Sequence, residues 1–269
     1  MKHTNESGVS MSLSINISPY SMIKKSILLL ALSVFLSVNA FAQFEGLVMF
    51  NGYDVDDPES TRSKIHMTIT PERILIMSDR QVNVMMGLNA NGILVRNDQK
   101  DVVLMTGGSD ALRLQQSDLD NFFNLLQRFQ GAPAPRTNFD WDANIEVTGR
   151  SRMLHGYRVE EIVMKNSEDN TSVSVWLTDQ IKVNWGLLID TWNRFGHIIS
   201  EEEIPIDLFV NRNSFPLLIE YYRGEELRTI IETTSLSQAR VAPSAVSVPA
   251  NVTMLGITDL MMRMLRGQR

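Results

Sequence analysis

The chain has 269 residues, of which 43% are hydrophobic and 21% are charged. This composition is typical of one large globular domain or two small ones, and it argues against a disordered chain and a multi-pass membrane protein. The 25 basic and 31 acidic residues give a formal net charge of -6, which disfavours a protein held to nucleic acid by phosphate contacts. The chain has no cysteine, so thiol nucleophiles, disulfides and thiolate metal sites are excluded.

A segment near the N-terminus has the order of a secretory signal peptide. Lys24 and Lys25 precede the apolar run 26–38, and Ala40-Phe41-Ala42 forms an A-x-A cleavage site before Gln43. The apolar run is shorter than the roughly 20 residues that a spanning helix needs. We therefore expect cleavage between Ala42 and Gln43, export to the periplasm or the cell exterior, and no transmembrane segment in the mature chain. Because no cysteine follows the cleavage site, we expect no lipid anchor.

The first part of the mature chain predicts short strands separated by turn residues. Ile65, Met67 and Ile69 alternate with polar residues, which indicates a half-buried strand. Asn91-Gly92 offers the positive φ that a tight hairpin requires, so we expect the chain to reverse there. The predicted strands cover residues 44–53, 65–69, 74–77, 82–88, 93–96 and 101–105.

Two amphipathic helices are predicted between the strands. The first begins at the cap residue Ser117 and ends at Gly131, and the second ends at Gly196. The Pro-containing connector 131–135 is interpreted as a linker between two parts of one sheet. The apolar stripe of the first helix consists of Leu119, Phe122, Phe123, Leu126 and Phe129, and that of the second consists of Trp185, Leu188, Ile189, Trp192 and Phe195.

The second part of the chain repeats this pattern. Strands are expected over 144–154, 157–165, 172–178, 217–222 and 225–235, with turns at His155-Gly156 and Arg223-Gly224. Residues 241–252 should be extended. We therefore predict a mainly β (α+β) fold, with a strongly curved antiparallel sheet or half-open barrel and two or three covering helices. The predicted organisation is a signal segment over 1–42, a single β-rich domain over 43–255 and a short amphipathic helix over 256–269.

Four segments of the chain resemble the DUF4412 family of exported bacterial proteins. They are Phe44-Glu45-Gly46, the stretch 148–161 (TGRSRMLHGYRVEE), the strand 173–178 (VSVWLT) and the closing segment 247–252 (SVPANV). The resemblance implies a similarity to LolA/LolB-like half-open barrels, which are periplasmic proteins able to hold acyl chains or other apolar ligands under a lid of helices. It implies no catalytic residues. Val159 stands where relatives often have cysteine, which removes a redox role.

No catalytic or metal-binding motif is visible. His66, His155 and His197 lie in a strand, a turn and a helix end without the spacing of a metal site. No G-x-S-x-G elbow and no phosphate-binding loop are present. Glu146, Glu160 and Glu161 are interpreted as solvent-facing strand positions, although a carboxylate pair that meets only in space is left open by the sequence. We expect no enzyme, no cofactor and no metal.

Methionine is the remaining signal. Thioether side chains are flexible and polarisable, so they suit surfaces that adapt to variable apolar ligands, although plain core filling explains them as well. We expect one sheet face to carry Met67, Met77 and Met105, and the helix stripe Leu119, Phe122, Phe123 and Leu126 to cover it. These seven residues are the predicted ligand cavity.

The sequence thus predicts an exported, non-catalytic binding or carrier protein for an apolar, lipid-like molecule such as an acyl chain. The alternatives are a structural or partner-binding component of the cell envelope whose core is filled by its own side chains, and a hydrolase whose site assembles in space. The expected partners are an apolar small molecule or an envelope protein, and not nucleic acid.

Overall fold

A computed structural model describes residues 43–85, 88–118, 144–189, 214–260 and 262. All of them belong to the second of the two units into which the chain divides, residues 43–269. Several predicted features therefore lie outside the described residues. They are the signal segment up to Ala42, the helix stripe from Leu119 to Phe129, the connector 131–135 and the second helix beyond Ile189.

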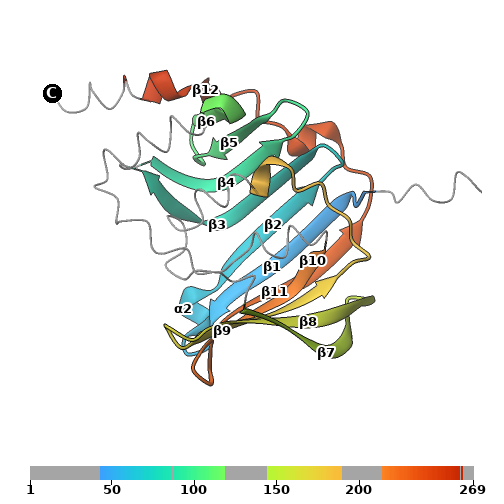
Figure 1. The fold of residues 1–269 in the computed structure, drawn as a ribbon. Helices are drawn as coiled ribbons and strands as arrows, with labels where there is room; N and C mark the ends of the chain where they lie inside the picture. The colour runs from blue at the N-terminus through green and yellow to red at the C-terminus, as the bar shows by residue number, and fades with distance from the viewer. Residues whose placement is uncertain (1–42, 86–87, 119–143, 190–213, 261, 263–269) are drawn as a thin grey trace, which may run out of the picture. The chain divides into compact units, whose positions relative to one another are not determined.

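The described strands form one open sheet of twelve strands (Figure 1). Its order is β12-β6-β5-β4-β3-β2-β1-β11-β10-β9-β8-β7, and every neighbouring pair is antiparallel except β12 and β6. The predicted strands 65–69 and 172–178 both belong to this sheet, which confirms the expectation of a single, mainly β, mostly antiparallel sheet. The strands are β1 Gly46–Asp54, β2 Ser63–Ile69, β3 Arg73–Met85, β4 Leu88–Arg96, β5 Asp101–Met105, β6 Asp110–Gln115, β7 Ile145–Leu154, β8 Tyr157–Asn166, β9 Thr171–Thr178, β10 Phe215–Arg223, β11 Glu226–Gln238 and β12 Thr253–Leu255.

Strands distant in sequence are joined at the centre and at one end of the sheet. The first strand, β1, pairs with β11 on one side and with β2 on the other. The last strand, β12, pairs with β6. Short helical segments accompany the described strands, including α2 Pro58–Thr61, η1 Gln116–Asp118 and η3 Pro243–Val246, and residues 187–189 and 257–260 are also helical. No helix within the described ranges is long and apolar enough to cross a membrane.

A large apolar cluster joins most of the sheet to the segment 181–189. Trp185 stacks on Phe215 with 5.6 Å between ring centroids, and Phe215 stacks on Phe50 at 6.2 Å. Backbone and side-chain hydrogen bonds fix this segment, because the Phe44 amide donates to the Lys182 carbonyl at 2.6 Å and Asn97 Nδ2 donates to the Asn184 carbonyl. The segment 181–189 therefore packs against strands from both parts of the chain.

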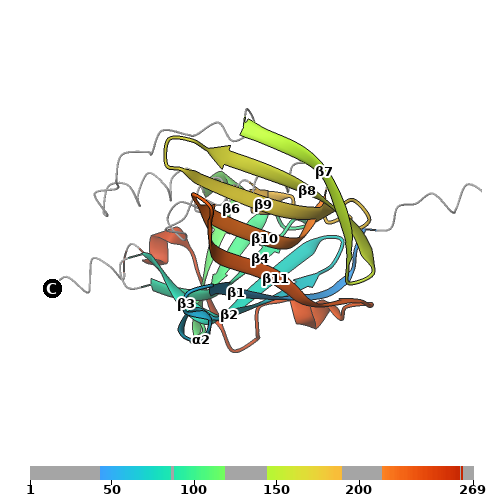
Figure 2. The same cartoon turned by 90° about the horizontal axis from the view of Figure 1, so that it is seen from below.

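The end of the sheet that carries β7 and β8 bends sharply. Both residues of the β7–β8 turn have positive φ, 50° at His155 and 82° at Gly156, as a two-residue type I′ hairpin requires. The His155 Nε2 atom lies 2.6 Å from the Thr233 carbonyl oxygen of β11, although two strands separate β8 from β11 in the sheet. Figure 2 shows β7 curving along its length, where its pairing with β8 shifts register between Val147 and Ser151.

The predicted turn at Asn91-Gly92 is wrong. β4 runs without a break through both residues, and Gly92 pairs with Met77 of β3. A Cβ atom at Gly92 would collide with the Met77 Sδ atom and lie 2.9 Å from the Ile76 carbonyl oxygen. Glycine is therefore required here by the close approach of a neighbouring side chain rather than by a turn. The strand β6, which follows the turn at Gly107, was not predicted from the sequence.

Candidate functional site

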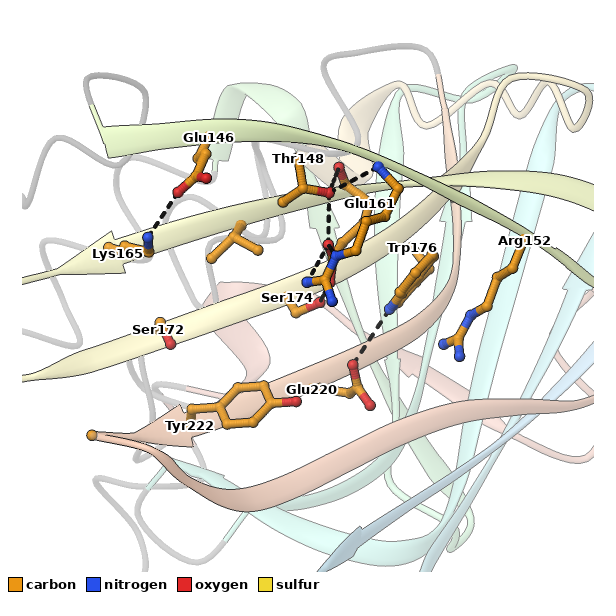
Figure 3. Close-up of a pocket in the computed structure, with 13 residues that line it drawn as sticks. Glu146, Thr148, Arg152, Glu161, Lys165, Ser172, Ser174, Trp176, Glu220 and Tyr222 are labelled. Carbon is orange, nitrogen blue, oxygen red and sulfur yellow. Dashed lines mark hydrogen bonds and ion pairs between the residues drawn. The ribbon is translucent and has the colours of Figure 1, made fainter.

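A cleft of about 490 Å³ lies on one face of β7, β8, β9 and β10 (Figure 3). We call it the polar cleft. The cleft is polar because successive residues of a strand point to opposite faces, so polar side chains at alternate positions gather on one face. It is lined by Glu146, Thr148, Arg150, Arg152, Glu161, Val163, Lys165, Ser172, Ser174, Trp176, Glu220, Tyr222 and Gly224.

The opposite face of the same strands is apolar and buried. Ile162 and Met164 of β8, together with Val173 and Val175 of β9, belong to one cluster there. Leu177 belongs to the same cluster, so Val173, Val175 and Leu177 alternate along β9 toward this face. The apolar face fixes the register of the strands, so it also fixes which polar side chains enter the cleft.

A buried carboxylate, Glu161, forms the floor of the polar cleft. Its side chain is 2% exposed, and Arg150 clamps it with Nη2 2.6 Å from Oε1 and Nε 2.5 Å from Oε2. The hydroxyl of Thr148 donates to Oε2 at 2.7 Å, and that of Ser174 donates to Oε1 at 2.8 Å. Both carboxylate oxygens are therefore satisfied by charged and neutral donors, as a buried charge requires.

Trp176 connects two further charged groups of the cleft. The Arg152 guanidinium lies over the indole with its Cζ atom 3.8 Å from the ring centroid, which is cation–π geometry. The indole Nε1 donates to the Glu220 carboxylate at 3.3 Å. Trp176 is itself 7% exposed, so it acts as a fixed platform that positions Arg152 and Glu220 at the cleft wall.

The mouth of the cleft carries an ion pair and a phenol. Lys165 Nζ lies 2.7 Å from Glu146 Oε2, and the pKa of Glu146 is lowered first by the hydrogen bond from Lys165 and then by its charge. The pKa of Tyr222 is raised, mainly by burial and further by the carboxylates of Glu220 and Glu161. The neutral phenol is therefore favoured at the pH of most natural environments.

The lining charges balance. Three basic side chains, Arg150, Arg152 and Lys165, face three acidic ones, Glu146, Glu161 and Glu220. Such an arrangement offers guanidinium, ammonium and hydroxyl donors beside carboxylate acceptors, without a net field of either sign. In the described part of the chain, no group of three or more His, Cys, Asp or Glu residues has the geometry to hold a metal ion.

The predicted methionine face is not formed as expected. Met67 pairs with Ile76, and Met77 pairs with His66, so Met67 and Met77 point to opposite faces of the sheet. Met67 is buried in the large cluster with Ile69 and Ile74. Met77 and Met105 lie on the other face, where both pair with Gly92. The predicted covering residues Leu119, Phe122, Phe123 and Leu126 are outside the described residues.

The predictions for the acidic residues and histidines agree with the structure at some positions and not at others. Glu146 and Glu160 are 57% and 66% exposed, as expected, but Glu161 is buried, and its interpretation as solvent-facing is wrong. Neighbouring residues of a strand point to opposite sides, so an adjacent pair of glutamates cannot share one environment. His66 is exposed on β2, His155 contacts β11, and His197 lies outside the described residues.

A second cleft, of about 480 Å³, lies beside β6 and β12. It is lined by Arg113, Gln115 and residues 254–258. Arg113 Nε donates to the fully buried carboxylate of Asp101 at 2.6 Å, and Arg96 binds the same carboxylate. This ion-pair network ties β4, β5 and β6 together, so Arg113 has a structural partner on the sheet.

Comparisons with known proteins give distant structural likenesses. No family model and no curated protein sequence matches the chain. PNGF-II, solved in space groups C2 and P21, is similar with 11% and 9% identity and TM-scores of 0.41 and 0.42, over 81% and 83% of this chain. This chain spans about a third of PNGF-II, 32% and 34% in the two structures. An uncharacterized conserved protein from Thermus thermophilus is similar with 6% identity and a TM-score of 0.40, over 84% of this chain and 98% of that one. Likeness at this level assigns neither a fold family nor a function.

Proposed function

We propose that this protein is an exported, non-catalytic binding protein that takes a neutral, hydroxyl-rich ligand of the carbohydrate class in the polar cleft. The observation that carries the proposal is the pre-formed wall around Glu161. Arg150 and Arg152 are held by Glu161 and Trp176 before any ligand arrives. Because these side chains are already ordered, ligand binding need not order them, and that entropic cost is reduced.

The balance of charge favours a neutral ligand over an ion. A strongly anionic ligand would meet Glu220 and Glu146, and a strongly cationic one would meet Arg152. Hydroxyl groups both donate and accept, so they pair with guanidinium donors and carboxylate acceptors at the same time. The ring of Tyr222 adds an apolar surface against which the less polar face of a sugar ring can pack.

The environment of Glu161 supports binding rather than hydrolysis. Its two oxygens accept from Arg150, Thr148 and Ser174, so the carboxylate is engaged as a structural anion. A general acid would need a hydrogen-bond path from its carboxyl group to the leaving oxygen of the substrate. The donors around Glu161 come from the protein itself, because Arg150, Thr148 and Ser174 surround both of its oxygens.

A glycan array probed with the purified, labelled protein tests this proposal. Retention of neutral oligosaccharides, with weaker retention of sulfated and uronic-acid glycans, is the expected result. Retention of acidic glycans alone would replace the neutral ligand with an anionic one, and no retention on any spot would contradict the proposal.

Export remains part of the proposal. The support is that the predicted cleavage site lies one residue before Phe44, which is 3% exposed and is the first buried residue of the described chain. A mature chain that begins at Gln43 contains every described strand of the sheet, because β1 begins at Gly46. N-terminal sequencing of protein from the cell envelope or medium should read Gln43 first, and an intact segment 26–38 would contradict cleavage.

The second candidate function is the binding of an apolar ligand in a LolA-like half-open barrel of the DUF4412 type. The observation that favours it is that β3, β4 and β5 are apolar on both faces, with Val95 and Val102 in one cluster and Leu94 and Val103 in another. The alternative of a self-filled core in an envelope component is supported by residues 241–254, which pack on the second of these clusters. A fluorescent fatty acid that binds the wild type but binds Met77→Trp weakly would favour the carrier function, because the indole would occupy the space of the ligand. No probe binding, with a lowered melting temperature of Met77→Trp, would favour the filled core.

A further inference from the structure

Soft donor side chains line up across neighbouring strands on one face of the sheet. His66 of β2 pairs with Met77 of β3, and Met77 pairs with Gly92 of β4. Gly92 in turn pairs with Met105 of β5. Directly paired residues of neighbouring strands point to the same face. The register therefore places an imidazole and two thioethers in one transverse row, with the smallest residue between the two methionines.

The row continues toward the edge of the sheet with the same pattern. Met105 pairs with Ala111 of β6, and Ala111 pairs with Met254 of β12. Met105 and Met254 both pack against the same buried cluster, to which Ala111 belongs. Small residues thus separate the methionines twice, which leaves room above the backbone for long side chains from either side.

The position of Met77 shows how that room is used. A Cβ atom at Gly92 would collide with the Met77 Sδ atom and lie 3.2 Å from its Cε. The thioether therefore extends over β4 toward β5, where Met105 is the next side chain of the row. Paired Cβ positions are about 4.5–5.5 Å apart, so the Met77 sulfur and the Met105 side chain are within reach of one bound ion.

These side chains remain accessible from solvent. Met77 and Met105 are half-buried and His66 is exposed, whereas Met67, on the other face, is 8% exposed within the core. Met77 and Met105 therefore keep part of their surface open to solvent, although Met105 also packs against the buried cluster.

We propose that Met77 and Met105 form a binding site for a soft monovalent metal ion, Cu(I). Thioethers are neutral, soft ligands that select Cu(I) over Zn²⁺, Mg²⁺ and Ca²⁺. The chain has no cysteine, so methionine and histidine are its only soft donors. The site is independent of the polar cleft, which is built from β7 to β10.

Titration of the purified mature protein with Cu(I), in competition with a chromophoric Cu(I) chelator under anaerobic reducing conditions, tests the proposal. The wild type should withdraw one equivalent of Cu(I), and Ag(I) should raise its melting temperature while Zn²⁺ leaves it unchanged. Met77→Leu and Met105→Leu keep an apolar side chain of similar volume, and each should weaken Cu(I) binding at least tenfold. His66→Gln should leave it unchanged, because the Met77 thioether extends over Gly92, away from β2.

The matched control is Met67→Leu, the same change on the opposite face, which should bind Cu(I) as the wild type does. Circular dichroism and thermal melts show whether each variant is folded. Failure of the wild type to compete with the chelator overturns the proposal by itself, whatever the variants do. Equal binding by wild type, Met77→Leu and Met105→Leu overturns it as well.

Discussion

Arg150 and Glu161 form an ion pair whose two partners lie in very different surroundings. The Arg150 side chain is 65% exposed, whereas Glu161 is 2% exposed, and two parallel hydrogen bonds of 2.6 and 2.5 Å join them. The exposed partner can return to water when the pair is broken. The buried partner cannot, so the two halves of this pair should differ in what their loss costs.

Loss of Arg150 should therefore destabilise the protein more than loss of Glu161 does. Arg150→Ala leaves a buried carboxylate with only the hydroxyls of Thr148 and Ser174, at a cost of about 2–4 kcal/mol in the free energy of unfolding. Glu161→Gln leaves Arg150 in solvent and should cost about 1 kcal/mol. Urea denaturation of both variants measures the difference, and an equal or reversed order would show that the pair does not anchor the cleft.

Tyr222 makes the stability of the polar cleft sensitive to alkaline pH. Burial, and then Glu220 and Glu161, raise the pKa of Tyr222 above its ordinary value. The folded state therefore holds the phenolic proton more tightly than the unfolded chain does. The resulting stabilisation is complete below pH of about 10 and is lost as the pH rises through the raised pKa.

Glu220→Gln should move the pKa of Tyr222 back toward its ordinary value, because it removes a nearby negative charge. The difference in tyrosinate absorbance between the wild type and Tyr222→Phe, followed as the pH rises, measures the titration of Tyr222 alone. An unchanged or higher pKa in Glu220→Gln would mean that its carboxylate does not act on the phenol.

Gly92→Ala should destabilise the sheet by about 1–3 kcal/mol, as overpacking does elsewhere. The added methyl group meets the Met77 sulfur and also the Ile76 carbonyl oxygen. Removing the Met77 side chain relieves only the first of these contacts. The double variant Gly92→Ala/Met77→Ala should therefore be more stable than the sum of the single changes predicts, and strict additivity would contradict the close approach.

The sheet should unfold in one cooperative transition. β1 pairs with β11 and β12 pairs with β6, so neither half of the chain contains all its own neighbours. Calorimetry and denaturation followed by fluorescence should agree on a single midpoint. Two separate transitions, or two folded fragments after proteolysis in 133–136, would contradict this arrangement.

Local patterns predicted much of the sheet. β2, β8 and β9 follow from the alternation of apolar and polar residues, and the His155-Gly156 turn follows from residues that tolerate positive φ. Gly92 was misread because the same residue serves a turn and a close approach across strands. Only the register of β3 against β4 distinguishes the two, and the register depends on long-range pairing.

The polar cleft was beyond sequence reasoning for a related reason. Glu161 looks like any polar residue on the wet face of a strand. Its burial depends on Arg150 and Thr148, which β7 brings over it from the neighbouring strand. The signal that was present is the adjacent pair Glu160-Glu161, because one member of such a pair must face the other side of the sheet.

The affinity of the polar cleft for neutral oligosaccharides tests the central claim most directly. Calorimetric titration of an oligosaccharide retained on the glycan array should give binding that falls at least tenfold in Arg152→Ala and in Tyr222→Ala. Arg158→Ala removes an exposed arginine of β8 that pairs with Glu160 outside the cleft, and it should bind as the wild type does. Wild-type affinity in Arg152→Ala and Tyr222→Ala, or an equal loss in all three variants, would contradict the assignment of the binding site to this cleft.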